Sequence, residues 1–412
     1  MTQPACRFCG APLTHDFVDL GSTPLSNAYL TRAQVEAGLD RAYPLHARVC
    51  DACFLVQVDA PVEPERIFDE DYAYFSSYSA SWVEHARRYA QAMIARFGLD
   101  GHALVVEAAS NDGYLLQHFV AAGVPVLGVE PAGNAAEAAR ARGVRSEVSF
   151  FNEATARSLV AKGFSADLTA ANNVLAHVPD IADFVRGFSV ILKPEGVSTF
   201  EFPHVLNLIR ESQFDTIYHE HYSYLSLVTV EKVLAAAGMR AFDVEELATH
   251  GGSLRLYACR ANASHEQTDA LVAMRDKERA FGLHGVAGYA GFAAQVEKVK
   301  SSFRAFLELA RSEGKTIAAY GAAAKGNTFL NVCGVTPEDI ACVYDLSHAK
   351  QGRLLPGSHI PILSPDQIDD LKPDYLVILP WNLRDEIIAQ MDRIRTWGGR
   401  FVTAVPDTQV FD

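Results

Sequence analysis

The segment from Asp215 to Ser226, DTIYHEHYSYLS, concentrates side chains that can move protons. Within it stand Tyr218, His219, Glu220, His221, Tyr222 and Tyr224. Histidine titrates near neutrality and suits a general base, while a carboxylate and phenols can orient it or contact a substrate. Two other interpretations are a structural polar strand edge and a metal site built on the His-x-His pair. The metal site is the weakest, because no third ligand is identifiable and the pattern is not HExxH.

A strand over this segment would alternate its side chains between two faces. His219 and His221 would then share one face, and the tyrosines would share the other with Glu220. Which histidine faces a substrate depends on the helices and strands that position this segment.

Four cysteines near the N-terminus form two CxxC pairs, which suit a tetrahedral zinc ion. They are Cys6, Cys9, Cys50 and Cys53. Four thiolates leave no open coordination position, so the zinc would be structural and would offset the small core of so short a module. The remaining cysteines, Cys259, Cys333 and Cys342, stand in apolar strand-like contexts and are predicted to be core residues.

From about residue 80, strand and helix patterns alternate, which predicts a parallel, doubly wound α/β sheet. The first strand runs into the turn 107–113 (EAASNDG), whose small residues allow a ligand close to the backbone. The turn is not GxGxxG, so it matches a dinucleotide fingerprint poorly. The second strand ends in Glu130, placed to accept hydrogen bonds from both ribose hydroxyls of an adenosine. A Rossmann dehydrogenase would also place an acid there.

The motifs VVEAASNDGYLL, GVEPAGN and ANNVLAHVPD, together with the double CxxC, resemble the S-adenosylmethionine-dependent sugar C-methyltransferases. That family acts on 4-keto deoxysugars attached to a nucleoside diphosphate. The resemblance covers essentially the whole chain. It implies an α/β fold, with a class I methyltransferase Rossmann-like core between a small N-terminal zinc module and a second, C-terminal Rossmann-like domain. One departure is Ala109, where a glycine is usual in the cofactor loop.

The resemblance also implies roles for individual residues. The S-adenosylmethionine site would include Glu107, Ser110, Asn111, Asp112, Gly113, Glu130, Pro131, Asn172 and Asn173. The reaction site would include His221 as general base, with Glu220, Tyr218, His177 and Tyr72. A carbon nucleophile needs such a base because the C3 proton, acidified by the C4 carbonyl, must first be removed, and the enolate then needs hydrogen-bond donors. Tyr72 belongs to an aromatic-rich segment, 69–81, that would close over the cofactor.

A second strand–helix array begins at residues 315–331 (KTIAAYGAAAKGNTFLN). Its Gly/Ala-rich turn leads into a helix N-terminus, which favours an anion, and the cations that follow the next strand suit a diphosphate. This domain is therefore predicted to hold the nucleotide of the sugar. NAD binding and a ligand-free Rossmann domain are the alternatives. The expected substrate contacts are Tyr72, His219, Tyr222, Arg255, Gly321, Ala322, Lys325, Asp345 and Lys350, and the loop THGGS adds His250 and Ser253.

These patterns divide the chain into a zinc module (1–62), a linker or active-site lid (63–82), the S-adenosylmethionine-binding core (83–262), a helical connector (263–312) and the C-terminal domain (313–412). In the connector, apolar residues at helix spacing predict core packing; they are Phe292, Val296, Val299, Phe303 and Phe306.

The composition excludes two classes of partner. The net charge of −14 argues against nucleic acid, because phosphate binding needs a basic surface. No run approaches the 18 apolar residues expected of a membrane span, and MTQPACRFCG is not a signal pattern. A cytoplasmic monomer or small homo-oligomer is expected.

The predicted function is methylation at C3 of a nucleoside-diphosphate 4-keto-6-deoxy sugar through a histidine-generated enolate. An O- or N-methyltransferase of the same fold is one alternative, and it would need no enolate. A nicotinamide-dependent sugar oxidoreductase using the YGAAAKG turn is another, and a non-catalytic nucleotide-sugar binder is a third.

Overall fold

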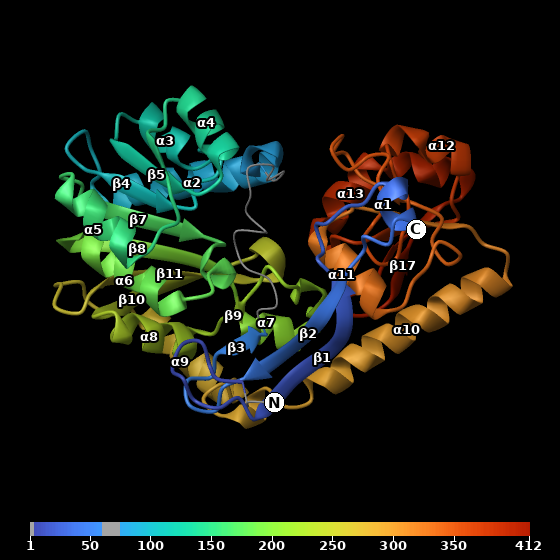
Figure 1. The fold of residues 1–412 in the computed structure, drawn as a ribbon, viewed down its shortest axis with the longest axis horizontal. Coiled ribbons are helices and arrows are strands. Elements are labelled where there is room, and N and C mark those ends of the chain that lie inside the picture. Colours follow the sequence, from blue (N-terminus) through green and yellow to red (C-terminus); the bar gives the residue numbers. More distant parts are fainter. Residues whose placement is uncertain (1–3, 60–74) are drawn as a thin grey trace.

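The computed structural model describes residues 4–59 and 75–412, so Tyr72 and most of the predicted lid lie outside the described residues. Three sheets organise the described chain (Figure 1). In that view the core lies on the left, the C-terminal domain on the right, and the N-terminal hairpin runs between them along the base. None of the described helices combines the length and the apolar character needed to cross a bilayer.

The N-terminal sheet is antiparallel and has the strand order β1-β2-β3-β9. Its elements are β1 (His15–Pro24), α1 (Arg32–Glu36), β2 (Ala42–Val49) and β3 (Val56–Val58). The fourth strand, β9 (Ser223–Tyr224), comes from the histidine-rich segment and pairs with β3 through Val56 and Gln57. The histidine-rich segment is therefore hydrogen-bonded to the zinc module.

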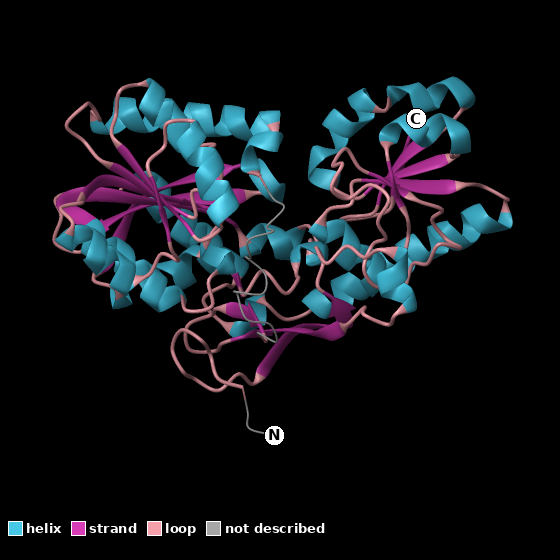
Figure 2. Cartoon of the chain, turned by 45° about the horizontal axis from the view of Figure 1, so that its top comes forward, coloured by secondary structure: helices cyan, strands magenta, loops and turns pink. Residues whose placement is uncertain are grey.

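The core is a seven-stranded sheet of order β10-β11-β8-β7-β4-β5-β6 with helices on both faces (Figure 2). Strands β4 to β8 are parallel, and β11 and β10 add an antiparallel edge. Its central strands are buried apolar runs, as expected for strands covered on both faces. The elements are α2 (Ala80–Phe97), β4 (Val105–Ala108), α3 (Leu116–Ala121), β5 (Val126–Glu130), α4 (Gly133–Ala141), β6 (Ser146–Val148), α5 (Glu153–Ala161), β7 (Ala166–Asn172), α6 (Ile181–Ile191), β8 (Leu192–Pro203), α7 (Val205–Arg210), α8 (Leu227–Ala236), β10 (Met239–Leu247) and β11 (Ser253–Arg260).

The connector contains α9 (Asp269–Phe281) and the long helix α10 (Phe292–Ser312). The predicted apolar stripe of α10 is confirmed as core: four of its members are buried, and Phe306 packs against them half-buried. The helix runs from the zinc module to the C-terminal domain (Figure 1).

The C-terminal domain is a six-stranded sheet of order β14-β13-β12-β15-β16-β17, parallel except at β17. Its elements are β12 (Ile317–Tyr320), α11 (Ala324–Val332), β13 (Val343–Tyr344), β14 (Ile362–Leu363), α12 (Ile368–Leu371), β15 (Tyr375–Ile378), α13 (Arg384–Gln390), β16 (Arg400–Thr403) and β17 (Gln409–Phe411). The second Rossmann-like array predicted from the sequence is thus present.

The histidine-rich segment is not a strand along its length, so the alternation of faces considered above is wrong. A 3-10 turn at Phe214–Thr216 leads into a tight turn in which His221 N donates to Tyr218 O at 2.9 Å. The turn brings the side chains of Tyr218 and His221 together. Ser226 then caps α8, accepting a hydrogen bond from Thr229 N.

Candidate active site

The loop after β4 is fixed by the acid at the end of β5. The Glu130 carboxylate accepts hydrogen bonds from Asn111 N and Ala132 N, both at 2.9 Å. Gly113 has φ +79°, and a side chain there would meet Ala139 of α4, so glycine is required for both conformation and space. Pro131 leads from Glu130 into the turn before α4. The predicted cofactor loop and Glu130 therefore form one unit at the carboxyl edge of the sheet.

Buried polar atoms around this loop lack hydrogen-bond partners among the described residues. They are Glu107 Oε2, Ser110 Oγ, Asp112 Oδ1 and both amide atoms of Asn172 and of Asn173. Buried polar groups are normally satisfied, so such a cluster indicates a ligand position. The set offers carboxylates, amides and a hydroxyl, which match the amino acid and ribose portions of S-adenosylmethionine.

The charge of the loop also favours a cationic ligand. Burial raises the pKa of Glu107 well above its usual range, and the neighbouring Glu130 and Asp112 add to this rise. Burial likewise raises the pKa of Glu130. Asp112 is paired with Arg142 at 2.8 Å. A ligand with a sulfonium and an ammonium group would compensate the remaining buried carboxylates.

Ala109 occupies a left-handed conformation with φ +53°. A β-carbon in that region costs about 1–2 kcal/mol of steric strain, which glycine avoids. Glycine in turn loses about 0.5–1 kcal/mol more backbone entropy than alanine on folding. We expect Ala109→Gly to keep S-adenosylmethionine affinity and to raise the free energy of unfolding by up to about 1 kcal/mol. Ala109→Val should lower both the S-adenosylmethionine affinity and the free energy of unfolding, because a β-branched residue fits poorly at positive φ. Calorimetric titration and chemical denaturation measure the two quantities, and equal behaviour of the two variants would contradict the assignment.

The second cluster is built on His221, Tyr218 and His177. Nδ1 of His221 lies 2.9 Å from the Thr216 carbonyl oxygen, and Nε2 lies 2.8 Å from the Tyr218 hydroxyl. A neutral imidazole therefore carries its proton on Nδ1 and accepts the Tyr218 hydroxyl proton at Nε2. The His177 ring stands edge-on to His221, 4.5 Å between centroids, and its Nδ1 lies 2.9 Å from the Glu220 carbonyl oxygen. The backbone of the segment thus orients both rings.

The other members of the segment point elsewhere. Nε2 of His219 lies 3.1 Å from the Pro44 carbonyl oxygen in the zinc module. The Glu220 carboxylate accepts a hydrogen bond from Asn27 at 2.7 Å, and burial raises its pKa. The Tyr222 ring is fully buried beneath the Arg7 guanidinium. Of the two histidines, His221 is the one that joins Tyr218 and His177.

The protonation of His221 gives a pH prediction. Burial lowers the pKa of His221 well below its usual 6.5, and the neighbouring histidines and Lys325 act in the same direction. The neutral ring accepts protons, so its active form persists to lower pH than for a free histidine. We expect kcat/KM to stay constant as the pH falls through 6.5 and to decline only below it. An acid limb centred above pH 6.5 would contradict a neutral His221 base.

In the C-terminal domain, the Gly/Ala-rich turn is held by side chains from the segment after β13 and from the N-terminal module. Asp345 accepts from Ala322 N and Ser347 N, both at 2.8 Å, and Lys350 Nζ donates to Ala322 O at 2.9 Å. Tyr29 from the N-terminal hairpin donates to the same carbonyl at 2.6 Å. Gly321 has φ +90°, and a side chain there would meet Pro380.

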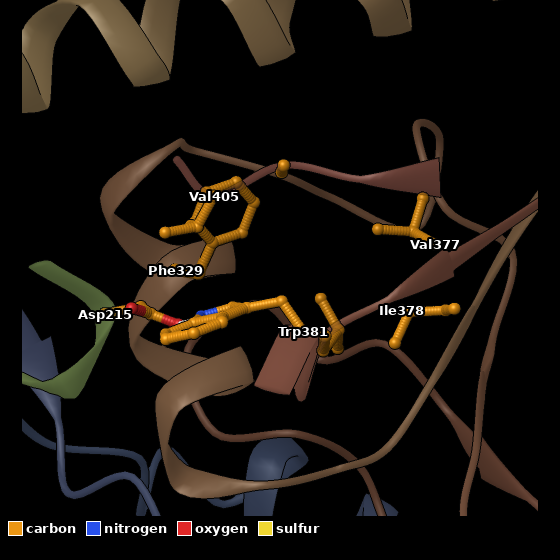
Figure 3. A pocket seen from close by; sticks show the side chains of 8 residues that line it. Asp215, Phe329, Val377, Ile378, Trp381 and Val405 are labelled. Carbon is orange, nitrogen blue, oxygen red and sulfur yellow. Dashed lines mark hydrogen bonds between the residues drawn. The ribbon is translucent and has the colours of Figure 1, made fainter. Parts of the chain in front are cut away.

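Lys325 packs beside Trp381, which contacts the start of the histidine-rich segment. Its Nζ donates to Asn382 at 2.7 Å and lies 4.6 Å from the Trp381 ring centroid. Trp381 Nε1 in turn donates to Asp215 at 2.7 Å, and the two side chains face one another beside a small cavity (Figure 3). Burial raises the pKa of Asp215 to about 6, with Lys325 opposing that rise. The C-terminal domain therefore contacts the residue that begins the histidine-rich segment.

Arg255, predicted to contact substrate, lies in a charge network of the core. Its guanidinium pairs with Glu201 and Glu245, both at 3.0 Å, and lies over the Tyr89 ring. Glu201 also accepts from His85 at 2.9 Å. The positive charge of Arg255 is thus compensated inside the core.

The four cysteines of the N-terminal module converge. Their sulfur atoms all lie within 4.8 Å of one another, as a tetrahedral four-thiolate shell requires. Gln57 Nε2 donates to Cys6 Sγ at 3.1 Å, and Arg7, between the first two cysteines, donates to the carbonyl oxygens of Val58 and Tyr222. The donors present fit structural zinc, and the same knuckle contacts the histidine-rich segment.

Sequence reasoning missed Asn27, Arg7 and Trp381 as neighbours of this segment, and it assigned no role to Asp215 within the segment. Asn27 and Arg7 come from the first 30 residues and Trp381 from the last 40. Of these residues, Trp381 could have been proposed from the sequence. It lies just beyond the carboxyl end of a Rossmann-like strand, where ligands usually bind.

The sheet order and the buried, unsatisfied polar groups at its carboxyl edge are those of a class I S-adenosylmethionine-dependent methyltransferase, here joined to a zinc module. Three family models match: one described as "Putative zinc binding domain" over residues 6–68, a methyltransferase domain over 82–244 and a C-methyltransferase C-terminal domain over 248–406. The chain is 36% identical to C-methyltransferase NovU of Streptomyces niveus over 405 residues, covering 98% of this chain and 96% of that protein. The chain belongs to this family of C-methyltransferases.

Solved methyltransferase structures match about half of the chain. The 1,6-didemethyltoxoflavin-N1-methyltransferase of Burkholderia thailandensis is 19% identical, covers 50% of this chain and 94% of its own, and has a TM-score of 0.36. The magnesium protoporphyrin IX methyltransferase of Synechocystis PCC 6803 is 16% identical, with coverages of 43% and 83% and a TM-score of 0.35. Family membership decides for carbon methylation over the O- or N-methyltransferase, oxidoreductase and non-catalytic alternatives.

Proposed function

We propose that this enzyme methylates C3 of a nucleoside-diphosphate 4-keto-6-deoxy sugar. The observation that carries the proposal is the His221–Tyr218 hydrogen bond, with a neutral, proton-accepting Nε2, in a C-methyltransferase. The His221 ring packs against His177, which follows the Asn172 end of β7. Methyl transfer to oxygen or nitrogen needs no carbon acid, whereas methyl transfer to C3 needs a base that removes a C–H proton.

The proton path follows from the hydrogen bonds. The C3 proton passes to the Tyr218 oxygen while the Tyr218 hydroxyl proton passes to Nε2 of His221, and the C–H electron pair becomes an enolate with its charge on the C4 oxygen. His221 becomes an imidazolium, stabilised by the Thr216 carbonyl at Nδ1. Bound S-adenosylmethionine would supply an electrophilic methyl group for the enolate carbon, with the sulfur keeping the electron pair of the S–CH3 bond. His177 keeps the His221 ring in place from its edge.

The nucleotide portion of the substrate would lie between the N-terminal hairpin and the C-terminal domain. Lys325 and Lys350 supply cations there, and Gly321, Ala322 and Asp345 shape the turn that carries them. Of the other predicted substrate contacts, Tyr72 lies outside the described residues. His219, Tyr222 and Arg255 each interact with protein groups.

The test is incubation of the purified enzyme with methyl-labelled S-adenosylmethionine and a panel of 4-keto nucleotide sugars. We expect the label on a carbon bonded to C3, and solvent deuterium entering at C3 when the methyl donor is replaced by S-adenosylhomocysteine. A labelled oxygen or nitrogen, or no product from any 4-keto sugar, would overturn the proposal.

A further inference from the structure

The loop between β10 and β11 contains three consecutive residues in left-handed backbone conformations, one of which is a histidine. His250, Gly251 and Gly252 have φ of +54°, +86° and +107° in succession. Left-handed backbone is uncommon outside glycine and persists where the surroundings over-determine it. Here Gln213 donates to Gly251 O at 2.8 Å, and His204 N donates to Gly252 O at 3.0 Å.

Both sides of the loop are closed by packing. A side chain at Gly251 would lie 2.4 Å from the Trp381 ring, and one at Gly252 would lie 2.3 Å from Asn207. Trp381 belongs to the C-terminal domain and is hydrogen-bonded to Asp215, as Figure 3 shows. The loop is therefore wedged between the two Rossmann-like domains, next to the start of the catalytic segment.

This backbone presents a histidine without an assigned partner. His250 Nδ1 is buried and has no hydrogen-bond partner among the described residues, and the ring stands edge-on to Trp82 at 5.1 Å. Burial, with Lys325 adding to it, lowers the pKa of His250 to about 4, so the ring is neutral at neutral pH. A neutral ring offers one N–H donor and one acceptor.

The reaction cluster needs such a donor. Backbone carbonyls fix the protons of His221 and His177 on Nδ1, so both rings present Nε2 as an acceptor. Gln213, which donates to Gly251 O, also accepts a hydrogen bond at its backbone carbonyl oxygen from the Thr216 hydroxyl at 2.7 Å. The carbonyl oxygen of Thr216 in turn holds Nδ1 of His221, so the loop adjoins the turn that positions His221. The carbon acid also requires hydrogen-bond donors at the oxygen where negative charge develops.

We propose that His250 donates a hydrogen bond to the C4 oxygen of the 4-keto sugar and stabilises its enolate, from the strained loop that Trp381 closes. The inference rests on the proposed function and assigns to it a donor on a different element from the base. It also gives the left-handed loop a role, because that backbone holds a histidine where a relaxed turn would not.

The test uses His250→Gly, which suits the positive φ and removes the ring without straining the fold. We expect kcat to fall by about 10²–10³-fold, as for the loss of one oxyanion donor, with S-adenosylmethionine affinity unchanged. Added imidazole should restore part of the rate in this variant and none in the wild type. His250→Asn, which tolerates the conformation and keeps an N–H donor, should lose less than His250→Gly.

A kcat for His250→Gly within about threefold of wild type would overturn the proposal. An equal loss of kcat in His250→Gly and His250→Asn, with no rescue by imidazole, would also overturn it. The wild type is assayed in parallel for C-methyl product and for deuterium entry at C3. Absence of both in the wild type refutes the proposed function, whereas their presence with an unaffected His250→Gly variant refutes only the role of His250.

Discussion

Replacing His221 with glutamine should lower kcat by about 10²–10⁴-fold, the usual contribution of a general base. Glutamine keeps a donor toward the Thr216 carbonyl but cannot take a proton from Tyr218. Deuterium exchange at C3 of the substrate should fall by a similar factor, because the same proton transfer limits it. Binding of S-adenosylmethionine should not change, since the cofactor loop lies on other strands.

The matched control is His219→Gln, two residues away in the same turn. Nε2 of His219 faces the Pro44 carbonyl oxygen in the zinc module, whereas the Tyr218 hydroxyl is bonded to His221, so this variant should keep kcat within a few-fold of wild type. Tyr218→Phe should lose activity as His221→Gln does, because the proposed proton path passes through the Tyr218 hydroxyl to His221. Full activity in His221→Gln, or equal losses at His219 and His221, would show that the base has been assigned to the wrong side chain.

Removing zinc should abolish turnover while leaving cofactor binding in place. Knuckles of this kind do not hold their fold without metal, and β9 pairs directly with β3 of the same module. Loss of that pairing would displace His221, and a misplacement of about 1 Å is enough to cost about 10²-fold in rate. Chelator-treated enzyme should show this loss, with S-adenosylmethionine affinity kept by the separate core and activity returning on addition of zinc.

Two cysteine variants sharpen the zinc experiment. Cys9→Ser removes a proposed ligand from the exposed side of the cluster, and it should lower both zinc content and turnover. Cys342→Ser makes the same substitution in the buried core of the C-terminal domain and should keep both. A zinc-free enzyme with wild-type kcat would show that the module does not position the catalytic segment.

Local pattern was enough to predict the two parallel strand–helix arrays and the turn after the first core strand, because strand, turn and helix signals depend on neighbours along the chain. The N-terminal antiparallel sheet was not predicted. The run before Glu107 is apolar, the turn after it is small, and Glu130 ends the next strand, so the loop could be predicted without tertiary information. The zinc ligands could be predicted for the same reason, since CxxC spacing is itself local.

The histidine-rich segment could not be predicted in the same way. A polar stretch with alternating aromatics fits a strand, but the tight turn at His221 and the pairing of β9 with β3 depend on residues far away in the chain. The partners of Glu220 and Asp215 are Asn27 and Trp381, near opposite ends of the sequence. Side-chain contacts at that separation have no periodicity to reveal them.

Because β9 from the histidine-rich segment completes the N-terminal sheet, the N-terminal module is built from two separate parts of the chain. A fragment ending at residue 62 would hold all four cysteines and still leave β3 as an open sheet edge, prone to pair with another chain. Exchanging this module between two C-methyltransferases therefore calls for two grafts, the first 59 residues and the strand Ser223–Tyr224. Because the second graft adjoins Tyr218 and His221, exchanging the module also changes the immediate surroundings of the proposed reaction site.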